Sequence, residues 1–212
     1  MQSNWVQDTL SKHDQTKLDA KDLFASYWHQ IDEVNRFKPS SVLEVGIGNK
    51  FVSSYFQRLG YNMVTLDVLR GFEPMVVSSV LTLPFKEKSF DVCLCCEVLE
   101  HLPYEYFGNA LSEFHRVSRK AFVMSLPDVS WCLSIKLSLT NLPLPFSKMS
   151  YVSFPRLLWR NYPFNGQHYW DIGKKGYGLK KIVRSINDAG FTIFKNYRVF
   201  EKPFHRFFVL KP

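Results

Sequence analysis

The sequence lacks an apolar run long enough to cross a bilayer, and its first ten residues lack the apolar core of a signal peptide. Cysteine is scarce, and three of the four cysteines crowd into residues 93–96. Side chains alternate along a strand, so Cys93 and Cys95 share one face while Cys96 points away, an arrangement that suits neither a zinc site nor a disulfide framework. We therefore expect buried reduced thiols, no metal site and a cytoplasmic protein.

Long runs of like charge are also missing, although the formal net charge is +8. A positive excess predicts an anionic partner, such as nucleic acid, an anionic membrane surface or a phosphorylated acceptor. Because the basic residues are scattered, a solvated basic surface explains the charge equally well. Internal repeats and low-complexity segments are absent, and 212 residues of which 46% are hydrophobic predict one globular domain.

A glycine motif is the most informative feature that is present. The apolar run Val42–Val45 ends in Gly46 and Gly48, and Asp67 follows about twenty residues later. Glycines are needed where the backbone turns sharply and approaches a ligand closely. A carboxylate after the next strand can accept hydrogen bonds from both hydroxyls of a ribose, so the motif predicts an adenosine-containing cofactor. The dinucleotide fingerprint needs a third small residue, and Phe51 stands there instead.

Hydrophobic periodicity predicts strands that alternate with helices. The expected helices cover about 19–37, 52–59, 103–117 and 174–189. The expected strands cover 42–45, 63–66, 75–80, 90–96 and 121–126, and a hairpin covers 191–200 and 204–210. This order predicts an α/β fold with a doubly wound, Rossmann-like sheet of seven strands, mostly parallel, with a C-terminal antiparallel β-hairpin.

The chain is expected to form a single domain with two elaborations, an N-terminal helical region at about 1–38 and an insertion at about 128–173. The insertion has no clear helix or strand pattern, which favours a lid or an acceptor-binding segment. Its aromatics, interleaved with basic residues, favour in this order a small aromatic core, an acceptor pocket or a peripheral membrane contact, and these do not exclude one another. The aromatics are Trp131, Phe146, Tyr151, Phe154, Trp159, Tyr162, Phe164, Tyr169 and Trp170.

Further motifs follow the glycine loop in a fixed order. They are Leu83-Pro84-Phe85, Ser89-Phe90-Asp91, Glu97-Val98-Leu99-Glu100-His101-Leu102 and Gln167-His168-Tyr169-Trp170-Asp171-Ile172-Gly173. Together they resemble the class I S-adenosylmethionine-dependent methyltransferases, most closely the small-molecule type called methyltransferase 11. The resemblance extends over about 41–127 and reappears at 167–173 and in the terminal hairpin. It implies that S-adenosyl-L-methionine is the cofactor.

The resemblance also implies which residues contact this cofactor. They are Glu44, Gly46, Gly48 and Asn49 in the glycine loop, Asp67 and Val68 after the second strand, Ser79, Val80 and Leu81 beside the adenine, and Glu97 and His101 after the fourth strand. Asp67 would bind the ribose hydroxyls, and Val68 would lie against the adenine. Ser79 stands where the family often has an acid, and its hydroxyl can still accept one hydrogen bond. Glu97 would face the transferring methyl group, and His101 would order that loop.

Catalytic candidates follow from the chemistry of a sulfonium. Because the sulfonium is already a strong electrophile, the protein chiefly aligns the reacting atoms. A base is needed only when the acceptor is a hydroxyl or a protonated amine. The candidate bases are His168, His101 and Glu97, with His168 preferred because it lies in the insertion that faces the acceptor, and Tyr169 is the positioning group. Glu100 is interpreted as a helix N-terminal acid.

The acceptor is narrowed by what does not follow the fourth strand. Cys96-Glu97-Val98-Leu99 stands where adenine amino-methylases carry Asn/Asp-Pro-Pro-Tyr, and no Pro-Cys pair offers the thiol that attacks cytosine carbon. A small-molecule or lipid-like, amphiphilic acceptor is therefore favoured. The alternatives are an RNA methyltransferase, a non-catalytic cofactor-fold partner subunit and, less favoured, a dehydrogenase. The oligomeric state is left open.

Overall fold

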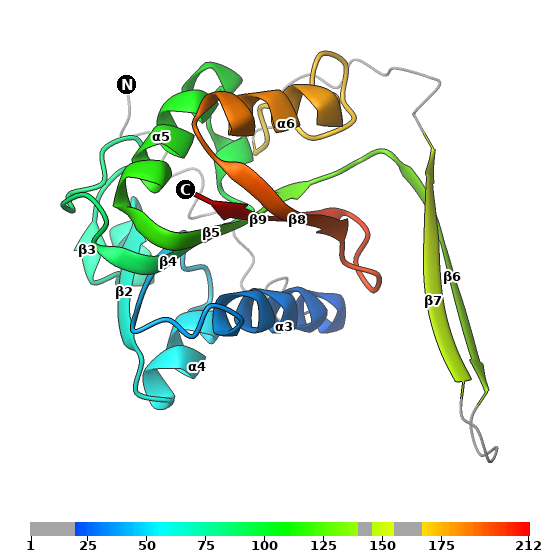
Figure 1. The fold of residues 1–212 in the computed structure, drawn as a ribbon, viewed down its shortest axis with the longest axis horizontal. Helices are drawn as coiled ribbons and strands as arrows, with labels where there is room; N and C mark the ends of the chain where they lie inside the picture. The colour runs from blue at the N-terminus through cyan, green and yellow to red at the C-terminus, as the bar shows by residue number, and fades with distance from the viewer. Residues whose placement is uncertain (1–19, 140–145, 155–166) are drawn as a thin grey trace.

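The structure is a computed structural model that describes residues 20–139, 146–154 and 167–212. Its centre is a seven-stranded sheet (Figure 1). In spatial order the strands are β3 (Val76–Val77), β2 (Asn62–Asp67), β1 (Ser41–Val45), β4 (Phe90–Cys96), β5 (Ser118–Pro127), β9 (His205–Lys211) and β8 (Thr192–Arg198). The first five are mutually parallel, and β9 lies antiparallel to both β5 and β8. The predicted fold class is confirmed.

Helices cover both faces of the sheet (Figure 1). The helices α3 (Lys21–Asn35) and α4 (Phe51–Arg58) lie on one face, and α5 (Phe107–Val117) and α6 (Leu179–Asp188) lie on the other. Three short 3₁₀ turns connect elements: η1 (Arg70–Phe72), η2 (Leu99–His101) and η3 (Tyr104–Tyr106). Among the described residues, no helix is long and apolar enough to span a membrane.

Two hydrophobic cores lie on the two sides of the sheet because the side chains of its strands alternate. Cys93 and Cys95 of β4 pack in the core beneath α5 and α6, whereas Val92 and Leu94 pack on the α3 side. Cys96 packs against that second core, as the alternation predicted. All these thiols are free, and burial raises the pKa of Cys93 to about 12. They are therefore protonated packing residues.

Two predicted elements are shorter than expected. The third strand covers only Val76–Val77 rather than 75–80. The last helix begins at Leu179 rather than near 174, because Gly173 and Gly176 have positive φ values of 91° and 84° and so interrupt the helical backbone. The other predicted helices and strands are confirmed to within a few residues.

The expectation that 128–173 carries no strand pattern is wrong. Residues Trp131–Leu139 (β6) and Phe146–Phe154 (β7) form an antiparallel two-stranded ribbon, which projects away from the main sheet (Figure 1). Apolar and polar residues alternate along β6, a period-two signal that the density of prolines and aromatics nearby obscured. The remaining parts of this insertion, 140–145 and 155–166, and residues 1–19 of the N-terminal region lie outside the described residues, so the division of the domain stays a prediction.

A buried ion cluster ties the base of this insertion to the C-terminal hairpin. Asp128, just after β5, is 3% exposed and contacts two buried arginines. Arg198 of β8 donates from Nε to Asp128 Oδ2 at 3.0 Å, and Arg206 of β9 does so at 2.7 Å. Arg198 also donates to the Ser130 carbonyl from both Nη atoms at 3.2 Å. Hydrogen bonds from both guanidiniums hold the pKa of Asp128 below its usual range, against the effect of burial.

We expect Asp128→Asn to lower the free energy of unfolding by about 3–5 kcal/mol, because it leaves two buried guanidiniums without their counter-charge. Chemical denaturation monitored by circular dichroism measures this loss. Asp188→Asn, an exposed acid of α6, is the matched control and should change stability by less than about 0.5 kcal/mol. Equal stability of the two variants would contradict the assignment.

Candidate active site

The glycine loop between β1 and α4 is packed tightly against the segment that follows β4. Gly46 has φ +80°, and its amide donates to the Leu66 carbonyl at 2.9 Å. A Cβ on Gly46 would lie 2.1 Å from Val98 Cγ2, so no larger residue fits without displacing Val98. Gly48 has φ +48° with open space around it. The loop therefore offers exposed backbone at Gly48 and a fixed turn at Gly46.

Asp67 fixes the position of this loop. Asp67 lies at the end of β2 and is only 8% exposed. Oδ2 accepts a hydrogen bond from the Ile47 amide at 3.1 Å, and Oδ1 accepts one from the Leu69 amide at 2.8 Å. Each carboxylate oxygen has a second lone pair, so Asp67 can order the loop and still accept hydrogen bonds from a ribose.

Glu44 places a buried carboxyl group directly before the glycines. It is 5% exposed, and among the described residues no hydrogen-bond partner reaches its Oε2. Burial raises the pKa of Glu44 to about 8, against hydrogen bonds from Ser53 that lower it. At neutral pH the group is therefore mostly protonated, and it can donate a hydrogen bond to a ligand.

The residues expected around the adenine lie along the β2–β3 side of the edge. Val68 is 47% exposed, which leaves its apolar surface open to a planar base. The Ser79 hydroxyl accepts a hydrogen bond from the Leu81 amide at 3.2 Å and so orders that turn. Val80 is buried in the core, and Leu81 packs against it. Asn49 Oδ1 accepts a hydrogen bond from the Phe51 amide, the first of α4, at 3.1 Å.

Glu97 occupies the tip of β4 in a left-handed backbone conformation, with φ +54°. Its Oε1 accepts a hydrogen bond from Ser125 Oγ at 2.7 Å, and His205 Nε2 lies 3.7 Å from Oε2. Burial, with the nearby charge of Glu100, raises the pKa of Glu97 well above its usual value. Burial also lowers the pKa of His205 to about 3. The raised pKa favours the protonated carboxyl of Glu97, which can donate a hydrogen bond to a ligand.

Three side chains converge beside Glu97. Glu100, His101 and His168 each place one ligand-capable atom within 4.8 Å of the other two. Glu100 is fully buried, and neither carboxyl oxygen has a hydrogen-bond partner among the described residues. Burial raises the pKa of Glu100 to about 8. The two imidazole rings meet edge to face, with centroids 4.9 Å apart. The sequence predicted both histidines as candidate bases, whereas Glu100 was interpreted only as a helix N-terminal acid.

His168 belongs to a short hydrogen-bonded chain. His168 Nδ1 lies 2.7 Å from Asp171 Oδ1, and Lys174 Nζ lies 2.6 Å from Asp171 Oδ2. Although burial acts to raise it, the hydrogen bonds from His168 and Lys174 hold the pKa of Asp171 below its usual range. An ionised Asp171 favours the tautomer with a proton on Nδ1, which leaves Nε2 as the reactive nitrogen. Sequence reasoning missed Asp171, although its spacing of three residues from His168 was visible.

Backbone pairing fixes the segment that carries His168. The Ile172 amide donates to the Pro127 carbonyl, and the Val129 amide donates to the Ile172 carbonyl, both at 2.9 Å. The Tyr169 amide donates to the Glu100 carbonyl at 2.9 Å, and the Tyr169 side chain is half-exposed. Trp170 is fully buried in the main core, where its indole donates to the Leu102 carbonyl at 2.9 Å. Trp170 is thus part of the main core rather than of a separate aromatic core in the insertion.

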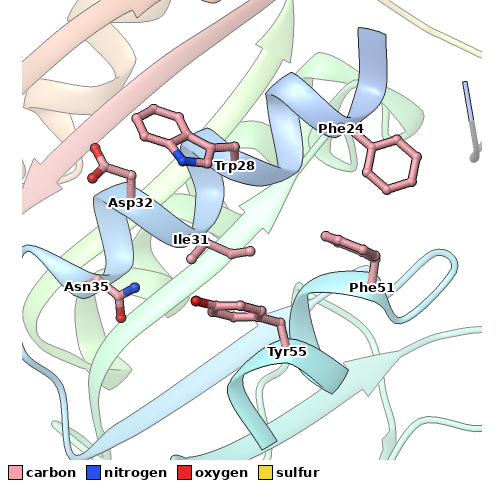
Figure 2. Close-up of a pocket in the computed structure, with 7 residues that line it drawn as sticks. All are labelled: Phe24, Trp28, Ile31, Asp32, Asn35, Phe51 and Tyr55. Atoms are coloured by element: carbon pink, nitrogen blue, oxygen red, sulfur yellow. The ribbon is translucent and has the colours of Figure 1, made fainter. Parts of the chain in front are cut away.

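A groove of about 420 Å³ lies elsewhere, between α3 and α4 (Figure 2). Ile31 of α3 faces Tyr55 of α4, and the Phe24 ring meets Phe51 edge to face with centroids 5.2 Å apart. It is lined by Phe24, Trp28, Ile31, Asp32, Asn35, Phe51 and Tyr55. None of the predicted site residues lines this groove, so it is distinct from the candidate active site.

Comparisons with known proteins agree with this geometry. Residues 43–122 match the family model described as a methyltransferase domain. An uncharacterized protein of Methanocaldococcus jannaschii is 36% identical over 83 residues, which span 36% of this chain and 35% of that protein.

Solved methyltransferase structures superpose on nearly the whole chain. A 1,6-didemethyltoxoflavin N1-methyltransferase of Burkholderia thailandensis, solved with 1,6-didemethyltoxoflavin and S-adenosylhomocysteine, has a TM-score of 0.64 at 16% identity, covering 99% of this chain and 85% of that one. The glycopeptide N-methyltransferase MtfA has a TM-score of 0.55 at 11% identity. That comparison covers 88% of this chain and 90% of MtfA. The chain therefore has the fold of these solved methyltransferases, and its residues 43–122 match the methyltransferase-domain model.

The buried carboxyl of Glu44 predicts a pH effect on stability. Its pKa is about 8 in the folded protein against 4.5 ordinarily, so the folded state holds a proton that the unfolded state has lost between these values. Stability therefore falls as pH rises from about 4.5 to 8. Glu44→Gln removes this contribution. The variant should gain more than about 1 kcal/mol over the wild type across that window, because one pKa unit is about 1.4 kcal/mol.

Urea denaturation at a series of pH values measures this difference. The exposed acid Glu201 provides the control variant, Glu201→Gln, which should track the wild type at every pH. A Glu44→Gln curve parallel to the wild type would show that Glu44 is ionised in the folded protein.

Proposed function

We propose that this protein is an S-adenosyl-L-methionine-dependent methyltransferase that methylates a small or amphiphilic acceptor. The observation that carries the proposal is the coupling of Asp67 to the glycine loop through the Ile47 amide. The carboxylate of Asp67, a turn that only glycine can make and the buried carboxyl of Glu44 lie at one edge of the sheet, which supports a role for Asp67 in binding a ribose. This is where ligands bind in open α/β sheets.

The residues of this edge fit the cofactor in chemistry as well as in position. Asp67 would bind the ribose hydroxyls, and the exposed Val68 and the turn at Ser79 would enclose the adenine. The orphaned Oε2 of Glu44 and the open backbone at Gly48 would meet the polar methionine portion. Bound S-adenosylmethionine supplies an electrophilic methyl group, so the protein itself must mainly orient the acceptor.

His168 is the residue best placed to activate an acceptor hydroxyl or ammonium. Asp171 fixes its ring, and the segment that carries it is paired to the end of β5, next to Glu97. In this proposal Nε2 of His168 takes the acceptor proton, and Asp171 stabilises the imidazolium that results. The protonated Glu97 donates a hydrogen bond rather than accepting a proton, and Tyr169 positions the acceptor.

The ribbon β6–β7 supports an acceptor with an apolar part. Trp131, Leu133 and Ile135 alternate along β6 and are all about half exposed. β6 begins three residues after Asp128, which pairs with Ile172. An apolar strip thus starts beside the segment that carries His168, and it would hold a lipid-like acceptor or rest on a membrane surface. The same strip suits an RNA acceptor less well, because RNA needs several stacked aromatics with phosphate contacts and Trp131 is the one aromatic among these three residues.

Cofactor binding is the direct test of the Asp67 assignment. Asp67→Ala should weaken the affinity for S-adenosylhomocysteine by about 100-fold or more, because two hydrogen bonds to a carboxylate contribute about 1.5 kcal/mol or more each. Titration calorimetry measures this change, with Asp188→Ala as the control. Nicotinamide dinucleotide should not compete. Unchanged affinity in Asp67→Ala would remove the site assignment, and competition by the dinucleotide would favour a dehydrogenase.

The acceptor class is identified by methyl transfer from radiolabelled S-adenosylmethionine into cell extract separated into small-molecule, lipid, nucleic-acid and protein fractions. We expect label in the small-molecule or lipid fraction. In that fraction, His168→Asn should lower turnover by about 100-fold or more while affinity for S-adenosylhomocysteine stays within about threefold. Equal losses of turnover and affinity would assign His168 to binding, and label only in RNA would overturn the acceptor class.

A further inference from the structure

The arrangement of Glu100, His101 and His168 is a ligand set for a metal ion, a possibility that the spacing of the cysteines did not suggest. Each residue offers one ligand atom, and these atoms lie within 4.8 Å of one another. His101 Nε2 lies 4.0 Å from Glu100 Oε1. Ligands of a tetrahedral ion at about 2.1 Å are roughly 3 to 3.5 Å apart, so small side-chain rotations would close the set.

The hydrogen bonds behind the two imidazoles are those of metal-binding histidines. His101 Nδ1 lies 2.8 Å from the Gln167 carbonyl oxygen, and His168 Nδ1 lies 2.7 Å from Asp171 Oδ1. Metal-ligating histidines almost always donate their second ring N–H to a carbonyl or a carboxylate, which fixes the tautomer and directs the other nitrogen to the ion. Both histidines use Nδ1 in this way, so Nε2 is the ligand atom of each.

Glu100 supplies an independent observation. The residue is fully buried, and both carboxyl oxygens are without a hydrogen-bond partner among the described residues. A buried carboxyl group in this condition is costly unless it is protonated or lies against a cation. A structural acid at a helix N-terminus would instead accept backbone amide hydrogen bonds. An ion between Glu100 and the two histidines would satisfy the orphaned oxygens.

We propose that Glu100, His101 and His168 bind a divalent first-row transition metal ion, with Asp171 and the Gln167 carbonyl orienting the histidines. Two imidazoles and one carboxylate favour Zn²⁺, Co²⁺ or Fe²⁺ over Mg²⁺, which prefers oxygen ligands. Three protein ligands leave a coordination position for a further group. If the proposed methyltransferase function holds, that group is an oxygen of the acceptor, and His168 acts through the ion rather than as the base.

Titration of chelator-treated protein with Co²⁺ and Zn²⁺ tests the site without any need for the acceptor. Saturable binding of one equivalent is expected, with a visible Co²⁺ absorption spectrum that lacks the near-ultraviolet band of thiolate ligation. Glu100→Gln and His168→Asn should each weaken binding by more than about 100-fold, since losing an outer hydrogen-bond partner alone costs about 10–100-fold. Asp171→Asn should weaken it by about 10–100-fold.

Matched controls are the exposed Glu105 and the partly exposed His115, because neither belongs to the cluster. Glu105→Gln and His115→Asn should bind Co²⁺ as the wild type does. Circular dichroism shows whether each variant is folded. Because Glu100→Gln and His168→Asn each remove one ligand, either folded variant tests the site. Wild-type affinity in both variants, no saturable binding, or binding of Mg²⁺ as tight as that of Zn²⁺ would overturn the proposal.

The test separates this proposal from the proposed function. Co²⁺ binding without affinity for S-adenosylhomocysteine would leave the metal site in place and remove the methyltransferase assignment. Affinity for S-adenosylhomocysteine without Co²⁺ binding would leave the methyltransferase assignment in place and remove the metal site. Where turnover is measurable, chelation should abolish it and Zn²⁺ or Co²⁺ should restore it, whereas a metal-free base at His168 would make turnover insensitive to chelation.

Discussion

Buried carboxyl groups at the carboxyl edge of β1 and β4 are the constraint on which this site depends. Glu44 and Glu100 are buried, each with at least one oxygen that lacks a partner among the described residues, and Glu97 is partly buried beside them. A fold keeps such groups only if they are protonated or if a ligand or cation satisfies them. The pKa values of about 8 for Glu44 and Glu100 express this cost. A ligand or cation that satisfied these groups would therefore stabilise the edge.

The rest of the architecture holds these groups in place. Asp67 joins the glycine loop to β2 through two backbone amides, and Gly46 allows that loop to contact Val98. On the acceptor side, pairing of Ile172 with the end of β5 fixes the segment that carries His168. The residues proposed to bind the cofactor and those proposed to meet the acceptor thus come from different parts of the chain.

How much the sequence could predict depended on whether a feature is local. The seven-stranded sheet and the glycine loop follow from hydrophobic periodicity and from glycine positions, which act over a few residues. The ribbon β6–β7 was missed even though Trp131, Leu133 and Ile135 alternate, because its apolar face lies open rather than on a core. The cluster of Glu100 with His168 was not predictable, since it depends on a contact between segments 68 residues apart. Burial, which raises the pKa values of Glu44 and Glu97, is likewise a property of the assembled fold.

The ion cluster at Asp128 connects the C-terminal hairpin to the base of the insertion. Its arginines come from β8 and β9, the last strands of the chain, yet Asp128 also pairs with Ile172 and lies at the root of β6. The C-terminal hairpin therefore supports both the segment that carries His168 and the base of the ribbon β6–β7. Sequence drift in that hairpin would therefore change substrate preference by tilting the His168 segment and the ribbon together.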